Sequence, residues 1–324
     1  MSQRLLFSLT LLHMLLHTIA IATPAAVLLL DSLLATIRRF SFSGSHVVIT
    51  GGSSGIGLAI AKALLILPSP PGKVTIAART LSALNEAKDN LKDDRIQVLQ
   101  LDVTDAQACM KASESLADVD VLINCAGTSL PGVLETLSIH DIDHTIQLNL
   151  LGSIYLTRAL LPHMKAMRKG KIIFVSSQAG QAGLYGYTAY SASKFGLRGF
   201  AEALAMEVAP FNISVSVAFP PDTDTPCLAK ENLRKPELTR IISASSGLMK
   251  AEDVANKLIA GACDGQFLIS MNMDGWFLTS LTLGMPLATR GILETLVQLL
   301  LLPFLRLLGL AYNTYFYYLI YQHS

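Results

Sequence analysis

Tyr190 and Lys194 stand four residues apart in the chain. In a helix this spacing puts the phenol and the ammonium group on one face, one turn apart. An isolated phenol titrates near pH ~10 and exchanges protons poorly at neutral pH. A neighbouring cation favours the phenolate and makes proton exchange possible. The pair therefore predicts acid–base chemistry, although an ordinary surface helix can show the same spacing.

Other polar positions support the chemical interpretation of this pair. Ser177 lies thirteen residues before Tyr190, at the end of a predicted strand over residues 172–176. Asn149 lies in a predicted helix before that strand. Residues 124–127 follow the fourth predicted strand, where the ribose of a nicotinamide would pass. The cofactor contacts expected from this segment are Asn124, Ala126 and Gly127.

A glycine-rich segment closes the first predicted strand and precedes a helical pattern. Glycines at this spacing let the backbone turn tightly and approach a pyrophosphate, whose charge the helix N-terminus stabilises. The segment lies in the first strand–helix unit, as a dinucleotide-binding fold requires, so a phosphate loop is favoured over an ordinary glycine turn. The predicted contacts are Gly51, Ser53, Ser54, Gly55, Ile56 and Gly57.

The residues after the second and third predicted strands indicate which dinucleotide binds. NAD-binding proteins place an acidic residue near the end of the second strand, where it holds the ribose 2′-OH. This chain has Arg79 there, and its guanidinium can bind a 2′-phosphate. We therefore predict NADP(H) rather than NAD(H). Asp102 and Val103 follow the third predicted strand, and Asp102 is placed to contact the adenine. Asp102 could instead cap the N-terminus of the next helix, but Asp105 can fill that role.

Strand-like and helix-like segments alternate between residues 46 and 270. Several strand-like runs are apolar throughout, as in a sheet that is covered on both faces. This alternation predicts an α/β fold with a Rossmann-type, doubly wound parallel sheet in a domain spanning residues 41–270. The predicted strands are residues 46–50, 73–78, 95–101, 119–123, 171–176 and 213–218.

The N-terminal residues read as a membrane anchor. Hydrophobic residues make up 51% of the chain and charged residues 15%, below the ~25% of an average soluble domain. Residues 5–30 contain no Asp, Glu, Lys or Arg, and about 20 such residues span a bilayer core. We predict an uncleaved anchor within residues 1–40; a secretory signal peptide is the rival interpretation. Arg38 and Arg39 follow the span and only Arg4 precedes it, which favours a cytosolic body.

The C-terminal residues turn apolar again after Met271. Residues 295–305 and 307–322 carry no charge and are separated by Arg306. We predict that residues 271–324 associate with the membrane as a broken hairpin or a partly inserted amphipathic pair. An ordinary hydrophobic C-terminal subdomain is the alternative. Tyrosines suited to a membrane–water interface occur at positions 312, 315, 317, 318 and 321.

Two classes of ligand are not indicated. The net charge is only +1, which gives no sign of a nucleic-acid partner. The four cysteines show neither C-x-x-C spacing nor flanking histidines at metal-ligand spacing, so we expect no metal site and no disulfide framework. His13 and His17 lie one helical turn apart, but packing or headgroup contact is favoured over metal binding there.

On these motifs the chain resembles the short-chain dehydrogenase/reductase family over residues 46–270. The resemblance implies that Tyr190 protonates a ketone oxygen during reduction. It implies that Lys194 binds the nicotinamide ribose and lowers the Tyr190 pKa. Ser177 would hydrogen-bond the carbonyl, and Asn149 would hold a water relay to Lys194.

The chain departs from the family pattern at two positions. Cys125 stands where the family usually has a second asparagine, and Pro221 stands where it usually has a glycine. A proline there removes an N–H group and fixes φ, so contacts to the nicotinamide can differ. Thr223 and Thr225 remain candidates for the carboxamide.

A narrower resemblance rests on residues 175–181 and 219–226, together with the two apolar ends. It is to a membrane-bound branch of the family that reduces the 3-keto group of a long-chain sphingoid base with NADPH. The resemblance implies a lipid ketone substrate, contact with membrane lipids, an endoplasmic reticulum location facing the cytosol, and a possible homodimer. Reduction of a steroid, a retinoid or a 3-ketoacyl-CoA stays open, as does a non-catalytic nucleotide-binding scaffold.

Overall fold

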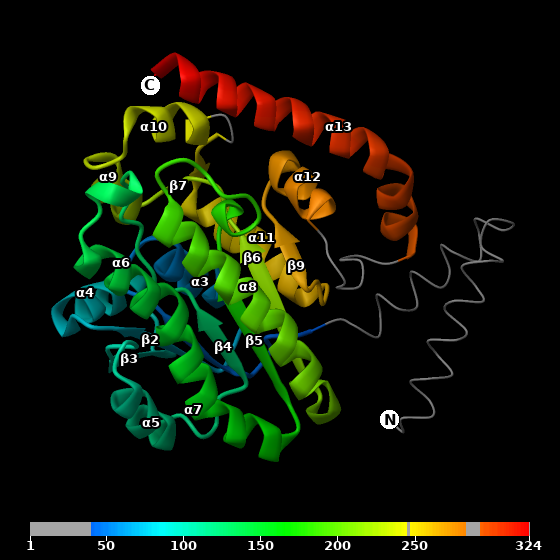
Figure 1. The fold of residues 1–324 in the computed structure, drawn as a ribbon. Coiled ribbons are helices and arrows are strands. Elements are labelled where there is room, and N and C mark those ends of the chain that lie inside the picture. The colour runs from blue at the N-terminus through cyan, green and yellow to red at the C-terminus, as the bar shows by residue number, and fades with distance from the viewer. Residues whose placement is uncertain (1–39, 245–246, 283–291, 324) are drawn as a thin grey trace, which may run out of the picture.

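The computed structural model describes residues 40–244, 247–282 and 292–323 of the 324-residue chain. Figure 1 shows a central sheet with helices on both sides and a long C-terminal helix lying across one end. All seven strands of this sheet run parallel, in the order β3-β2-β1-β4-β5-β6-β9. The strands are β1 His46–Thr50, β2 Lys73–Ala78, β3 Ile96–Gln100, β4 Val121–Asn124, β5 Gly170–Val175, β6 Ile213–Phe219 and β9 Leu268–Ser270.

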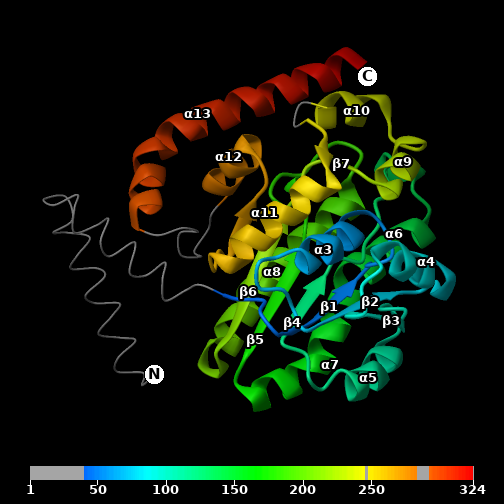
Figure 2. The same ribbon diagram turned by 180° about the vertical axis from the view of Figure 1, so that it is seen from behind.

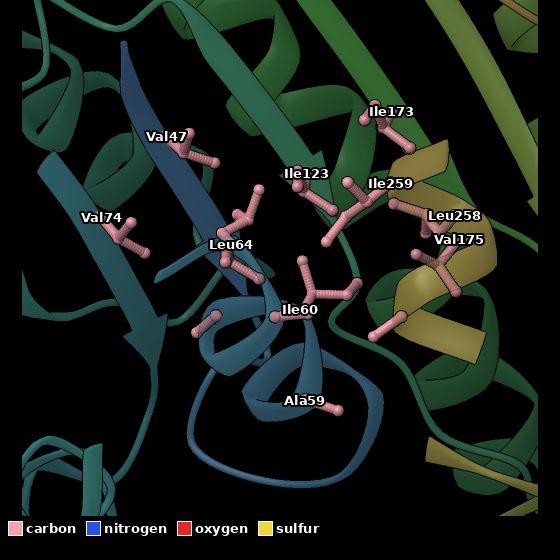
Figure 3. Close-up of a cluster of buried hydrophobic side chains, with 14 of the residues drawn as sticks. Val47, Ala59, Ile60, Leu64, Val74, Ile123, Ile173, Val175, Leu258 and Ile259 are labelled. Carbon is pink, nitrogen blue, oxygen red and sulfur yellow. The ribbon is translucent and has the colours of Figure 1, made fainter. Parts of the chain in front are cut away.

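Helices cover both faces of this sheet (Figure 2). One face carries α3 Gly55–Leu65, α4 Leu81–Leu91 and α11 Ala251–Cys263, and the other carries α5 Ala106–Ser115, α7 Gly152–Met167 and α8 Thr188–Val208. Each face of the sheet carries its own hydrophobic core, and alternate residues of β1 contribute to the two cores. Val47 and Ile49 pack in the core that contains α3, whereas Val48 packs in the core on the opposite face. Figure 3 shows the first core, where Ile60 and Leu64 of α3 meet strand side chains and α11.

The predicted doubly wound parallel sheet is confirmed, and burial on both faces explains its uninterrupted apolar strands. Every residue of β1, β4 and β5 is buried. The six predicted strands match observed strands to within two residues at each end. The seventh strand, β9, was not predicted; it pairs with β6 over only three residues.

A smaller assembly lies over the carboxyl ends of the central strands. It contains the two-stranded sheet of β7 Thr223–Asp224 and β8 Met249–Lys250, with helices α9 Pro226–Asn232 and α10 Glu237–Ala244. Helix α6 Ile139–Ile146 and a π-helical turn, Gln147–Leu151, precede α7. The π-turn places Asn149 at the site described below, a common use of such turns.

The C-terminal residues form helix α12 Met273–Leu281 and the 32-residue helix α13 Ile292–His323. Helix α13 contacts α12 and α10 (Figure 1). The broken hairpin expected around Arg306 is not observed, because α13 runs unbroken through Arg306 and Pro303. Among the described residues, no helix has the length and apolar character needed to cross a bilayer. The predicted N-terminal span lies outside the described residues.

Candidate active site

A cavity of about 240 Å³ opens at the carboxyl ends of β1, β4, β5 and β6. The sheet order reverses direction between β1 and β4, and doubly wound folds bind ligands at this point. The cavity wall includes the glycine loop, the segment after β4, and the start of α8. Of the predicted catalytic residues, Ser177, Tyr190 and Lys194 all line it.

The Lys194 side chain is positioned in the cavity by a backbone carbonyl group and an aromatic ring. Its Nζ donates to the Val175 carbonyl oxygen at 3.0 Å and lies 5.7 Å from the Tyr190 ring centroid. A Cβ on Gly127 would stand in ordinary contact with this Nζ, at 3.5 Å, but only 3.1 Å from Asn149 Oδ1, so glycine leaves room for the asparagine. Burial lowers the Lys194 pKa to about 8, because the charged form loses hydration.

Tyr190 and Ser177 share a hydrogen bond. Ser177 Oγ also accepts a hydrogen bond from the Ala179 N–H at 3.1 Å, which orients the hydroxyl. Burial raises the Tyr190 pKa above its ordinary value, against the lowering effect of the Ser177 hydrogen bond. The family resemblance implied that Lys194 lowers this pKa. In the structure burial is the largest effect and raises the Tyr190 pKa, so the phenol holds its proton at neutral pH.

Asn149, the fourth predicted catalytic residue, is fully buried and does not line the cavity. Its Oδ1 accepts from the Thr128 N–H at 2.8 Å, and its Nδ2 donates to the Thr128 carbonyl oxygen at 2.9 Å and to Ser193 Oγ at 3.0 Å. These bonds join the segment after β4 to helix α8, which carries Tyr190 and Lys194. The water relay predicted for Asn149 stays a prediction.

The glycine loop has the geometry of a pyrophosphate cradle. Gly51 and Gly55 adopt φ angles of 68° and 53°, a region that favours glycine. A Cβ on Gly57 would lie 2.3 Å from the Gly51 carbonyl oxygen, so the loop can close only without a side chain. Ser54 precedes α3 but makes no side-chain capping bond. The first N–H groups of α3 therefore face the cavity without an intrahelical partner and fit the phosphates of a dinucleotide.

The predicted adenosine contacts lie at the ends of β2 and β3. Arg79 is exposed just beyond β2, outside the lining of the 240 Å³ cavity. Asp102 accepts from the Thr104 N–H at 2.9 Å and from Thr104 Oγ1 at 2.7 Å. Burial acts to raise the Asp102 pKa, but these hydrogen bonds and the Arg79 charge hold it below its ordinary value. Asp105 caps α5, which leaves Asp102 available for a ligand. The Val103 side chain is buried, so only its backbone can meet a ligand.

The segments after β4 and β6 complete the predicted cofactor contacts. The N–H groups of Cys125 and Ala126 both donate to Thr50 Oγ1 at 3.0 Å, which fixes this turn against β1. Asn124 is buried, and its Oδ1 has no hydrogen-bond partner among the described residues. Thr223 Oγ1 donates to the Pro221 carbonyl oxygen at 2.9 Å, beside the cavity.

The smaller assembly of β7, β8, α9 and α10, which we call the cap, comes close to the glycine loop at Thr225. The Thr225 hydroxyl accepts from the Leu228 N–H at 3.2 Å and caps α9. A Cβ on Gly55 would lie 3.2 Å from Thr225 Cγ2. The cap and the phosphate cradle therefore enclose one space, which both line.

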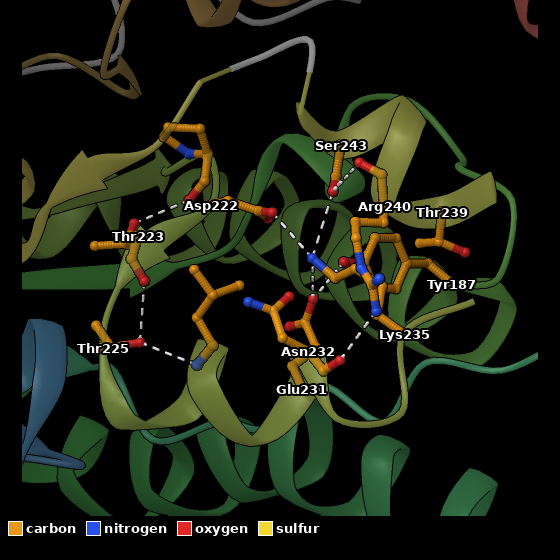
Figure 4. A network of polar contacts seen from close by, with 12 residues as sticks. Tyr187, Asp222, Thr223, Thr225, Glu231, Asn232, Lys235, Thr239, Arg240 and Ser243 are labelled. Carbon is orange, nitrogen blue, oxygen red and sulfur yellow. Dashed lines mark hydrogen bonds and ion pairs between the residues drawn. The ribbon is translucent and has the colours of Figure 1, made fainter. Parts of the chain in front are cut away.

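A buried ion network beside the cavity was not predicted from the sequence (Figure 4). Lys235 Nζ lies 2.7 Å from Glu231 Oε1 and 3.0 Å from Asp222 Oδ2, and the Tyr187 hydroxyl donates to Glu231. The Lys235 and Glu231 side chains are 1% and 8% exposed. The Tyr187 ring centroid is 5.4 Å from that of Tyr190, so the network braces the tyrosine expected to donate a proton.

The only sequence signal for this network is weak. Glu231 and Lys235 have the i, i+4 spacing of a helical ion pair, which is common on exposed helix faces. Nothing local in the sequence places this pair beneath a cap, because its burial depends on α10 and on the β7–β8 sheet.

Comparisons with known proteins agree with this geometry. The family model described as short chain dehydrogenase matches residues 45–236. The chain is 44% identical to a 3-ketodihydrosphingosine reductase of Bos taurus, over 90% of this chain and 91% of the relative. It is 43% identical to a 3-dehydrosphinganine reductase of Danio rerio, over 88% of each chain. A solved structure titled "ElxO with NADP Bound" is 28% identical, with a TM-score of 0.58 over 66% of this chain and 89% of that chain.

Proposed function

Because the chain belongs to the short-chain dehydrogenase/reductase family, we propose that it reduces 3-ketodihydrosphingosine to dihydrosphingosine with NADPH. The meeting of Ser177, Tyr190 and Lys194 in one cavity carries the chemistry of this proposal. The choice of substrate rests on similarity to the Bos taurus and Danio rerio reductases over most of the chain.

The residues present fit NADP(H). The uncapped N-terminus of α3 and the glycine loop would hold the pyrophosphate, Arg79 the 2′-phosphate, and Asp102 the adenine. When bound, NADPH supplies the hydride for the ketone carbon. Lys194 is only 5% exposed and lines the cavity, where its ammonium group would bind the ribose next to the nicotinamide.

The remaining work of reduction falls to side chains of this chain. Ser177 Oγ and the Tyr190 hydroxyl are placed to donate to one carbonyl oxygen and to stabilise the negative charge that develops there. Burial raises the Tyr190 pKa, so at neutral pH the phenol carries the proton that the ketone oxygen must receive. The phenolate left after proton transfer lies near the Lys194 cation, which stabilises it.

The test is NADPH oxidation by the full-length protein in a membrane fraction, with 3-ketodihydrosphingosine, a 3-ketoacyl-CoA and a ketosteroid compared. We expect the sphingoid ketone to give the highest kcat/KM. Tyr190→Phe should lower kcat by at least about 100-fold, the lower end of what general acids contribute, while NADPH still binds. Tyr185→Phe is the matched control and should retain activity. Preference for another ketone, or an active Tyr190→Phe enzyme, would contradict the proposal.

We further propose that the enzyme works at the cytosolic face of the endoplasmic reticulum membrane. Helix α13 supports this, because it exposes a row of large apolar side chains, among them Leu300 (81% exposed), Phe304 and Leu307. Contiguous apolar surface of this kind suits a lipid interface. The proposal keeps residues 1–40 as an anchor and 271–324 as a membrane-associated region.

Orientation is tested by glycosylation in microsomes. Leu233 is 86% exposed on the cap and its neighbour Asn232 is exposed too, so Arg234→Thr creates an acceptor sequon at Asn232 that is accessible to the transferase if the domain lies in the lumen. We expect no modification. Efficient glycosylation at this position would reverse the proposed orientation.

A further inference from the structure

A second cavity, of about 560 Å³, lies next to the catalytic one. It is enclosed by the segment from Gln178 to Leu184, by α12 and by α13. Most of its wall is apolar, and its lining includes Trp276 and Phe277 of α12 and Leu308 of α13. Its volume falls within the range of roughly 300–1,000 Å³ that holds drug-sized ligands.

The two cavities adjoin. Gln178 and Leu184 line both of them, and Gln178 directly follows the proposed catalytic Ser177. The segment that forms this shared wall is bonded to α12 and its N-cap: Gln178 Nε2 donates to Asn272 Oδ1 at 3.0 Å, and Gln181 Nε2 donates to Thr279 Oγ1 at 2.7 Å. A ligand whose carbonyl meets Ser177 and Tyr190 therefore has an apolar space directly beyond this wall.

The second cavity also reaches the protein surface. Met273, Asp274 and Arg306 line it and are exposed. Beyond Arg306, α13 carries the exposed Leu307 and Leu310. An apolar chain that passes the shared wall at Leu184 would therefore run between α12 and α13, towards the side of the molecule that presents apolar groups.

We propose that this second cavity binds the alkyl chain of the lipid ketone. The inference rests on the proposed function, which supplies a ketone attached to one long saturated chain. The catalytic cavity of about 240 Å³ is lined by polar groups such as Asp222 and Glu231, so it suits the polar end of the molecule. The larger apolar cavity suits the chain and sets the preference for its length.

Chain length supplies the first measurement. For 3-keto sphingoid bases with six to eighteen carbons, kcat/KM should rise about fourfold with each methylene that becomes buried, the fold-change equivalent to about 0.8 kcal/mol per CH₂. The rise should stop once the cavity is filled.

Trp276 supplies a second measurement that does not depend on turnover. It is the sole tryptophan of the chain and lines the second cavity, so chain binding should change its emission. Dihydrosphingosine analogues of graded length, kept below their micelle-forming concentrations, are the probes. The emission change should require the longer analogues.

Two substitutions should fill the cavity from opposite walls. A Cβ at Gly183 meets no atom within 4 Å, so Gly183→Phe adds a ring without a backbone clash. A Cβ at Gly309 would lie 3.0 Å from Leu281 Cδ1, a flexible end, so Gly309→Leu fills the α13 side. Both should lower kcat/KM at least tenfold for long chains and leave it unchanged for the shortest. Gly199→Phe, at an equally open site on α8, is the control.

The outcomes separate the two proposals. Reduction whose kcat/KM does not vary with chain length, or filled variants that keep the long-chain preference, would overturn the chain site and leave the proposed function intact. Absence of reduction for every chain length would refute the proposed function, and the chain site with it.

Discussion

Replacing Lys235 by methionine should destabilise the cap over the active site. Lys235 is 1% exposed and pairs with Glu231, which is 8% exposed, and with the more exposed Asp222. Methionine keeps most of the volume but leaves the Glu231 carboxylate buried without its cation. Breaking a buried pair from one side costs about 3–5 kcal/mol. We expect a loss of about 3 kcal/mol in the free energy of unfolding, because the Tyr187 hydroxyl still donates to Glu231.

A double-mutant cycle isolates this effect. Lys235→Met, Glu231→Gln and the double variant are unfolded in urea, and the double variant should be more stable than Lys235→Met because no buried charge remains unpaired. Burial acts to lower the Lys235 pKa, but the Glu231 hydrogen bond raises it overall. The stabilisation that Lys235 gains from this pairing is therefore complete at a pH below the lysine pKa of the unfolded chain, about 10.4. It is lost as the pH rises through the Lys235 pKa of the folded protein.

The cycle also has a kinetic readout. Tyr187 packs against Tyr190, so Lys235→Met should lower kcat as well as stability. Two results would refute the assignment of a stabilising buried network. One is a loss of less than about 1 kcal/mol in each single variant, and the other is a coupling energy near zero between the two substitutions.

Three further predictions concern the cofactor and the core. Arg79→Asp should shift preference from NADPH towards NADH by at least about tenfold in kcat/KM; an unchanged ratio would exclude a 2′-phosphate contact. Gly57→Ala should weaken NADPH binding at least about tenfold, measured by fluorescence titration, because the added Cβ would lie 2.3 Å from the Gly51 carbonyl oxygen; unaltered affinity would contradict the cradle. Lys171 is fully buried and its pKa is lowered to about 8, so its burial penalty is complete below pH 8 and is relieved as the pH rises towards 10.5. Lys171→Met should therefore stabilise the protein by up to about 3 kcal/mol at pH 7, with the gain shrinking above pH 8 in urea unfolding; the exposed Lys62→Met should show no such trend.

The sheet and the phosphate loop were predictable because their signals are local. An apolar run such as residues 46–50 can be satisfied only between two covered faces, and the glycines after it permit only a tight turn. Tyr190 and Lys194 were found for the same reason, since one helix fixes their spacing. The positions of Ser177 and Asn149 followed from the strand and helix that precede them.

Features that depend on distant segments were not predictable. Strand β9 has only three residues, and it becomes a strand because β6 offers it a free edge. The continuity of α13 through Arg306 was not predicted. A charged residue within an apolar segment suggests the end of a membrane-associated helix when the segments that pack against it are unknown. The raised pKa of Tyr190 depends on burial, which spacing along the chain does not report.

The bond between Gln178 and Asn272 has a kinetic consequence. Gln178 follows Ser177 in the chain, and Asn272 caps the N-terminus of α12 by accepting from the Gly275 N–H at 2.8 Å. A ligand that displaces α12 would therefore also shift Gln178 and the neighbouring Ser177. The Ser177 hydroxyl would then be misplaced for the carbonyl oxygen of the substrate, which becomes negatively charged in the transition state. An ill-fitting chain is penalised in the transition state as well as in the bound complex, so discrimination should appear in kcat and not only in KM.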